Sequence, residues 1–256
     1  MKQLSSSTLG SQIFMFVSLI STLLAVAIYG LTVNSLILIL LGYFLYGCLG
    51  IVVTYHRKLT HNSYNTYPLL TKVFSILGCF GGTGSPLAWV AIHINHHLKS
   101  DKLNDPHSPR YKGLNIFNLD YVNEISTDTK WRMRSMVTDK FHQFLHRYYF
   151  AIIILYSLSL YLIGGFYLMV FLHLAPALVT ILMSNVVNYV GHKPHWVGGY
   201  RSYNLNDDST NNWVWSIPSW GETWHNNHHR YPKNFSCGEK WWEVDISAYI
   251  IKLIKL

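Results

Sequence analysis

The residues of this chain that could do chemistry are histidines in repeated short clusters. The chain of 256 residues holds 14 histidines, and two segments, His93–His97 and His225–His229, share the pattern H-x-x-H-H. Spacings of three and four residues place side chains on one face of a helix. Each of these segments therefore predicts three imidazoles that point at one metal centre.

Two further sets of histidines lie at the ends of apolar segments. His56 and His61 follow one such segment, and His192 ends another with Asn188 one turn before it. A lone histidine at such a place is commonly an interfacial polar side chain, but two H-x-x-H-H segments in one chain favour metal binding. We assign structural roles to the other five: His107, His142, His146, His173 and His195.

The identity of the metal follows from the ligand type. Imidazole suits zinc, copper, iron and nickel, whereas the three distant cysteines and the absence of an H-E-x-x-H segment exclude thiolate and zinc-hydrolase sites. Two redox ions held by nitrogen ligands indicate iron and dioxygen chemistry. Two ions are expected because the coordination shell of one metal ion cannot hold nine imidazoles. The nine clustered histidines are His56, His61, His93, His96, His97, His192, His225, His228 and His229.

Three acidic residues, Asp101, Asp105 and Glu222, flank the clusters. Such carboxylates could accept the ring N–H of metal-bound histidines and so orient them. The alternative is that they are ordinary solvated loop acids, and the sequence leaves both interpretations open. A carboxylate-rich di-iron bundle is not expected, because only the Glu222–His225 segment aligns with the E-x-x-H motif of such sites.

The charge pattern indicates the elements that hold these residues. Hydrophobic residues make up 50% of the chain and charged residues 12%, a composition typical of membrane proteins. No charged residue lies between Lys2 and Arg57 or between Arg147 and Lys193, and each window has a break near its middle, at 32–35 and at 164–165. Because about 20 residues cross a bilayer, we expect four spans, roughly at 11–31, 35–55, 148–163 and 166–190.

All 20 Lys and Arg residues lie outside these spans and on one side of them. The positive-inside rule makes that side, with both termini, cytoplasmic. A secretory signal at the N-terminus is the alternative for the first apolar run. The glycine-rich stretch 69–92 predicts a re-entrant or interfacial segment. We attribute the net charge of +8 to anionic lipid headgroups, because no nucleic-acid-binding module is present.

The expected fold is therefore an all-α integral membrane protein. One domain, residues 1–256, would comprise four transmembrane helices in two hairpins and a cytoplasmic helical cap, 56–147 and 191–256, that carries a histidine-rich di-metal site. The histidine clusters all fall on the cytoplasmic side of this topology, although only charged residues were used to derive it.

These motifs match those of a known family. On them, and over most of 40–250, the chain resembles the membrane fatty-acyl desaturases, specifically the Δ9 (stearoyl-type) acyl-CoA or acyl-lipid branch. The matching segments are H-R-x-x-T-H at 56–61, W-V-A-I-H-x-x-H-H at 89–97, D-P-H-S-P at 105–109, N-x-x-x-H at 188–192, G-E-T-W-H-N-N-H-H at 221–229 and W-W-E-V-D at 241–245.

The resemblance implies that all nine clustered histidines ligate two iron ions and that Asn188 holds a metal-bound water, with no catalytic residue beyond the metal centre. The implied reaction is O2-dependent formation of a cis double bond, at Δ9, in a saturated acyl chain. The tail ends soon after Trp242, so we expect a separate electron donor such as a ferredoxin or cytochrome b5, docked on the basic surface. Trp89 is a candidate wall of an apolar substrate tunnel, with core packing as the alternative.

One departure from the family leaves the acyl carrier open. Ala91 and Ile92 precede His93 where animal acyl-CoA enzymes carry a charged pair, so the acyl group could be linked to CoA or to a membrane lipid. A di-iron membrane hydroxylase or ketolase is the main competing function. A metal transporter would place its ligands at mid-membrane depth, and an inactive relative is disfavoured because all nine ligand positions are filled.

Overall fold

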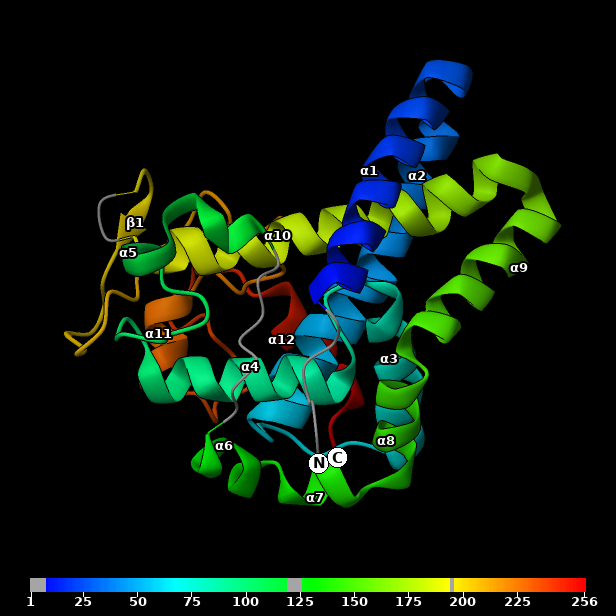
Figure 1. Cartoon of the computed structure of the whole chain (residues 1–256). Helices are drawn as coiled ribbons and strands as arrows, with labels where there is room; N and C mark the ends of the chain where they lie inside the picture. Colours follow the sequence, from blue (N-terminus) through cyan, green and yellow to red (C-terminus); the bar gives the residue numbers. More distant parts are fainter. Residues whose placement is uncertain (1–7, 119–125, 194–195) are drawn as a thin grey trace.

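The computed structural model describes residues 8–118, 126–193 and 196–256, and most of these residues are helical (Figure 1). A pair of two-residue strands joins antiparallel, with Gly199 opposite Asn212. The elements in chain order are α1 (Thr8–Tyr29), α2 (Val33–Tyr43), the π-helix η1 (Phe44–Thr60), α3 (Pro68–Phe80), α4 (Pro86–Lys99), α5 (Pro109–Lys112), the 3-10 helix η2 (Gly113–Asn118), α6 (Thr127–Arg132), α7 (Arg134–Thr138), α8 (Lys140–Arg147), α9 (Tyr149–Met169), the π-helix η3 (Val170–Leu174), α10 (Ala175–Gly191), β1 (Gly199–Tyr200), β2 (Asn211–Asn212), α11 (His225–Arg230) and α12 (Ile246–Ile254).

Three helices in the described part of the chain are long and apolar enough to cross a membrane: Thr8–Tyr29, Val33–Thr60 and Tyr149–Gly191. The third has 43 residues, and its backbone leaves the helical conformation at Gly164 and at Gly165, where φ is +65°. Glycine adopts this left-handed conformation without steric cost. The chain turns back there, as the bend between α9 and α10 in Figure 1 shows, so the break predicted at 164–165 is confirmed.

The turn between the first two apolar helices is also set by local chemistry. Helix α1 ends at Tyr29, and Thr32 caps α2, its Oγ1 accepting the Ser35 N–H while the Ser35 Oγ accepts the Thr32 N–H. Such a reciprocal capping box satisfies two N–H groups at the helix start. The helix break therefore lies at 30–32, just before the predicted position. Helices α1 and α2 both pack against η3 and α10.

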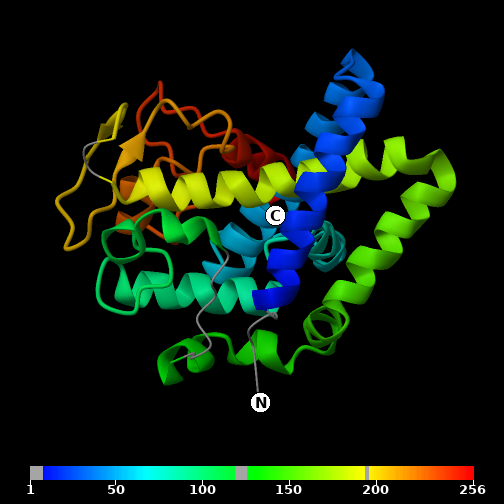
Figure 2. The same cartoon turned by 45° about the horizontal axis from the view of Figure 1, so that its top comes forward.

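Helix α4 packs against η1 and against the short helices α6 and α8 (Figure 2). The Ser85 side chain caps its start by accepting the Ala88 N–H, and Pro86 occupies the first turn. One face of α4 is apolar and packs against Met133 and Met136, and its members recur at helical spacing: Leu87, Val90, Ala91 and Ile94. The opposite face is thus left for the histidines at 93, 96 and 97.

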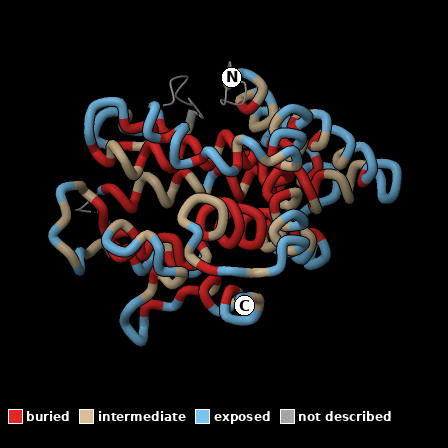
Figure 3. The backbone as a smooth tube through the Cα atoms, turned by 90° about the horizontal axis from the view of Figure 1, so that it is seen from below, coloured by how far each residue is buried: buried red, intermediate tan, exposed pale blue. Residues whose placement is uncertain are grey.

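The segment 69–92 forms parts of two helices, α3 and α4, joined by residues 81–85. Helix α3 lies close against η1 at two glycines, Gly50 and Gly78. A Cβ atom on Gly50 would come within 2.4 Å of the Gly78 nitrogen. Buried backbone lies mainly in the middle of the molecule and exposed backbone at its edges (Figure 3). Most of η1 is buried, and it packs against both α4 and α10. Whether 69–92 enters the bilayer stays a prediction.

Candidate metal centre

All nine clustered histidines converge in the structure, in two adjacent groups. In each group, every histidine contributes one ring nitrogen, and these nitrogens all lie within 4.8 Å of one another. The five-histidine group consists of His56, His61, His93, His97 and His228, and the four-histidine group consists of His96, His192, His225 and His229. The other described histidines, His107, His142, His146 and His173, belong to neither group, and His195 lies outside the described residues.

The π-helical geometry of η1 explains the five-residue spacing between His56, which lies within it, and His61, which directly follows it. The backbone N–H of His61 donates to the carbonyl of His56, five residues back, at 3.2 Å. A π-helix closes its turn at this spacing, so both imidazoles reach the same group. This conformation was not predicted from the sequence.

Each H-x-x-H-H segment supplies both groups, which corrects the prediction that its three imidazoles point at one centre. In α4, His93 and His97 join the five-histidine group while His96 joins the other. In α11, His228 belongs to the five-histidine group and its neighbour His229 to the four-histidine group. Consecutive residues differ by about 100° around a helix axis, so neighbouring imidazoles diverge towards two centres.

The two asparagines of the H-N-N-H-H segment anchor helix α11 from its other side. Asn226 Oδ1 accepts the backbone N–H groups of Ser202 and Tyr203, at 2.9 and 2.7 Å. Asn227 Nδ2 donates to Glu243 Oε2 at 2.8 Å. These contacts hold a helix of only six residues, which could not form by itself.

The end of α10 brings His192 against α11. A Cβ atom on Gly191 would lie 2.9 Å from the His225 ring, so only glycine permits this approach. The Thr210 N–H donates to the Gly191 carbonyl at 2.7 Å and caps the helix end.

Four carboxylates contact the Nδ1 atoms of histidines in the two groups, three of them by a hydrogen bond and Glu222 as an ion pair. Asp101 binds His192 at 2.7 Å and Asp105 binds His96 at 2.9 Å, while Glu222 binds His56. These are the three acids that the sequence analysis proposed. The fourth pair is Asp207 with His229, at 2.9 Å, and it was missed because no spacing relates Asp207 to a histidine cluster.

Arg57 ties one of these carboxylates to the C-terminal segment. Its guanidinium is buried, and it donates to Glu222 Oε1 at 2.8 Å and to Asp245 Oδ2 at 2.9 Å. Burial by itself raises the pKa of Glu222, but His56 and Arg57 bring it below the ordinary value. Glu222 is therefore a carboxylate that fixes the His56 ring.

Five of the nine imidazoles are held in the neutral form, the form that binds a metal, whereas for His96 burial lowers the pKa but the contact with Asp105 raises it overall. Burial first, and then neighbouring imidazoles, lower the pKa well below the ordinary value for these members of the groups: His61, His93, His97, His225 and His228. Burial raises the pKa of Asp105, but its contact with His96 lowers it overall. Where an ionised acid accepts Nδ1–H, a neutral ring keeps its Nε2 lone pair for a metal.

The spacing of the nitrogens fits bound cations. The Nε2 atoms of His56 and His228, of His93 and His97, and of His192 and His225 lie 3.0 Å apart. Two nitrogens at right angles and about 2.1 Å from one ion would be about 3.0 Å apart. His96 Nε2 is buried and has no hydrogen-bond partner in the described part of the chain, as expected of an atom reserved for a metal.

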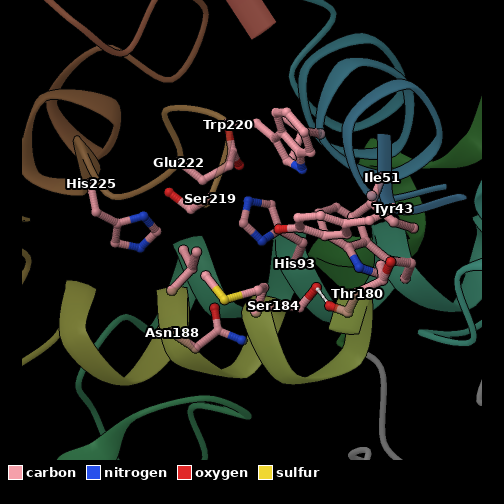
Figure 4. Close-up of a pocket in the computed structure, with 15 residues that line it drawn as sticks. Tyr43, Ile51, His93, Thr180, Ser184, Asn188, Ser219, Trp220, Glu222 and His225 are labelled. Atoms are coloured by element: carbon pink, nitrogen blue, oxygen red, sulfur yellow. Dashed lines mark hydrogen bonds between the residues drawn. The ribbon is translucent and has the colours of Figure 1, made fainter. Parts of the chain in front are cut away.

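A cavity between η1 and α10 leads to both groups (Figure 4). Apolar side chains such as Ile51 and Val187 line it, and His93 of one group and His225 of the other also contribute to its wall. Asn188 lines the cavity as well. Trp89 stacks on His93 with ring centroids 4.9 Å apart and forms another part of the wall. The cavity could therefore hold an apolar chain beside both histidine groups.

Comparison with known proteins agrees with this site. The family model for fatty acid desaturases matches residues 32–244. The chain is 34% identical over 220 residues to the sn-1 stearoyl-lipid 9-desaturase of Anabaena variabilis, covering 85% of this chain and 79% of that protein. It is 32% identical to Delta-9 acyl-lipid desaturase 1 of Arabidopsis thaliana, covering 82% and 69%. It is 33% identical to the acyl-CoA C20 Delta5-desaturase of Anemone leveillei, covering 83% and 68%. The chain therefore belongs to the fatty acid desaturase family.

Proposed function

We propose that this chain is an O2-dependent di-iron desaturase that introduces a cis double bond at Δ9 into a saturated fatty-acyl chain. One observation carries the proposal: a single apolar cavity reaches both histidine groups, through His93 and His225. An unactivated methylene has no acidic proton and no leaving group, so acid–base or nucleophilic catalysis cannot remove its hydrogens. The site must therefore combine an apolar channel with a redox centre.

In this proposal each histidine group holds one iron ion. The two irons and O2 would supply an oxidant strong enough to cleave unactivated C–H bonds. The carboxylates at 101, 105, 207 and 222 hold the Nδ1 protons of their histidines, which fixes ring orientation and keeps each Nε2 directed into its group. Asn188, which lines the cavity, would hold a metal-bound water.

The cavity wall would determine which carbons react. Trp89, stacked on His93, keeps that side of the ring covered and helps to confine the chain. Confinement places one pair of carbons beside the irons and excludes water from them. Two of the three relatives compared are named as 9-desaturases, which supports Δ9, and the acyl carrier would be CoA or a membrane lipid.

The proposed setting is a membrane with four spans and a cytoplasmic active site, in a single domain of residues 1–256. Its support is the three long apolar helices, of which the third is bent at Gly164 and Gly165 into two limbs. All Lys and Arg residues lie outside these helices except Arg57 and Lys58, which occupy the last turn of the second. Electrons would come from a separate carrier protein, such as a ferredoxin or cytochrome b5.

The test is expression in a desaturase-deficient host beside a His228→Ala control, with double bonds located by mass spectrometry. A new Δ9 monoene that the control lacks is expected. A hydroxylated product would assign the chain to the hydroxylases. Absence of any product from purified, iron-loaded protein supplied with reduced carrier and saturated acyl-CoA or lipid would contradict the proposal.

A further inference from the structure

The D-P-H-S-P segment at 105–109 is not explained by the metal centre alone. Asp105 binds His96, but His107 belongs to neither histidine group. The ring of His107 lies 5.6 Å from that of His96 between centroids. Its backbone N–H donates to Asp105 Oδ1 at 2.9 Å, whereas no hydrogen bond reaches its ring from residues 8–118, 126–193 or 196–256. The segment therefore places a half-buried imidazole with free hydrogen-bonding capacity beside the four-histidine group.

His107 lines a second, smaller cavity, the polar cavity. Five of its eight wall residues are polar: Thr83, His107, Ser184, Asn185 and Asn188. Three residues, Trp89, Ser184 and Asn188, also line the larger apolar cavity. Ser184 and Asn188 lie on α10 at the edge of that cavity (Figure 4). The polar and the apolar cavity are therefore neighbours that share one wall.

Asn185 gives the polar cavity a second hydrogen-bond donor. It lies on the apolar helix α10 and is 6% exposed. Its Nδ2 is buried and has no hydrogen-bond partner in the described part of the chain. A buried N–H group without a partner is destabilising unless a ligand or a water completes it. Two segments far apart in the sequence thus bring unpaired polar groups to the same small cavity.

An acyl ester or thioester matches this pair of cavities. Its hydrocarbon chain is apolar, and its carbonyl oxygen accepts hydrogen bonds, which the Asn185 amide and the His107 ring can donate. With the carbonyl in the polar cavity, the chain would pass Trp89 and enter the apolar cavity, where the metal-binding histidines lie. A bound water is the alternative occupant of the polar cavity, and the test distinguishes the two.

We propose that His107 and Asn185 bind the carbonyl oxygen of the acyl substrate, so that the polar cavity anchors the carboxyl end of the chain. This inference rests on the proposed function. A fixed carbonyl keeps the reacting carbons at a set number of bonds from the anchor, whatever the length of the chain. His107, for which the sequence indicated a structural role, is thereby a substrate-binding residue.

The test measures binding to iron-loaded enzyme in nanodiscs, without an electron donor and therefore without turnover. Each ester is paired with an analogue that lacks only the carbonyl oxygen. The pairs are stearoyl-CoA with S-octadecyl-CoA, and 1-stearoyl-lysophosphatidylcholine with its 1-O-octadecyl ether. Affinities are measured by competition with the radiolabelled ester, and empty nanodiscs give the background of the bilayer.

The variant His107→Phe/Asn185→Leu removes both donors and nearly keeps side-chain size. Its matched control is Asn95→Leu. Asn95 is 2% exposed and its Oδ1 has no hydrogen-bond partner within the described residues, but it lines neither cavity. Iron content checks that every variant is folded.

We expect wild-type enzyme to bind the ester of at least one pair about tenfold more tightly than its analogue, because the analogue leaves two buried donors unpaired. The double variant should bind both members equally, and Asn95→Leu should keep the wild-type ratio. A wild-type ratio near one overturns the inference. A ratio that the double variant leaves unchanged also overturns it, and would assign the two side chains to bound water or to the fold. Wild-type enzyme that binds neither ester would instead refute the proposed function.

The position of the new double bond gives a second readout, with the single variant Asn185→Leu. Wild-type enzyme should place the bond at the same count from the carboxyl end in chains of 16 and 18 carbons. Asn185→Leu should give a mixture of neighbouring positions, because its anchor is weaker. Less product with an unchanged position would contradict the anchor, since a merely structural role lowers yield without moving the bond.

Discussion

Replacing Asp207 by Asn should weaken one of the two metal sites and spare the other. Asp207 Oδ2 accepts the His229 Nδ1–H at 2.9 Å, and Oδ1 accepts the Ser209 N–H and Oγ–H at 3.0 and 2.6 Å. An asparagine can keep the Ser209 contacts but then presents an N–H to His229 Nδ1. His229 must accept that hydrogen bond and carry its proton on Nε2, which removes one nitrogen lone pair from the four-histidine group.

The magnitude follows from the loss of one oriented ligand. Removing a hydrogen-bond partner of a metal-bound histidine costs about 10- to 100-fold in metal affinity, or about 1.4 to 2.7 kcal/mol. The assay is anaerobic competition for Fe²⁺ between the purified protein and a chromogenic chelator. Two binding equivalents are expected, of which one weakens in Asp207→Asn.

The neighbouring acid provides the matched control. Asp208 forms an ion pair with Arg110 at 2.6 Å, and the arginine is 54% exposed. Such a pair contributes about 0 to 1 kcal/mol, so Asp208→Asn should bind both ions as wild type does. Equal affinities in Asp207→Asn and Asp208→Asn would refute the assignment of Asp207 as a residue that orients a ligand.

Three further results are expected. Arg57→Met leaves Glu222 and Asp245 buried without their cation, which should cost about 3 to 5 kcal/mol of stability and lower the thermal unfolding midpoint; an unchanged midpoint would contradict this. Gly191→Ala places a methyl group about 2.9 Å from the His225 ring. Iron content and product yield should therefore fall, while the helix content measured by circular dichroism stays constant. Full iron retention would show that this position does not require glycine. The imidazoles with lowered pKa bind fewer protons in the folded than in the unfolded chain. The metal-free protein should therefore lose stability as the pH falls below about 6.5, by up to about 1.4 kcal/mol per pH unit for each such group. A thermal unfolding midpoint that stays constant from pH 5 to 8 would count against this expectation.

Local features of this fold were predictable because local chemistry determines them. The glycine pair at 164–165 breaks a helix by its own backbone freedom, and three- and four-residue spacings place histidines on one helical face whatever packs around them. All nine candidate ligands could therefore be identified from the sequence. The motifs also identified the family, because two H-x-x-H-H segments with their flanking residues are specific to few proteins.

What was missed depends on contacts between distant segments. The partition of each H-x-x-H-H segment between two groups requires knowing what faces α4 and α11. Asp207 lies 22 residues from His229 in a polar segment, and its role appears only when β1 and β2 fold that segment against α11. The π-helical course of η1 has no spacing signature that distinguishes it from an α-helix.

Iron stoichiometry shows whether the nine imidazoles form two metal sites. Iron per chain would be measured for purified wild-type protein and for one variant of each group, His97→Ala and His192→Ala. About two irons in the wild type and about one in each variant are predicted. A wild-type chain that holds one iron or none after anaerobic loading, or variants that both keep two, would contradict the claim.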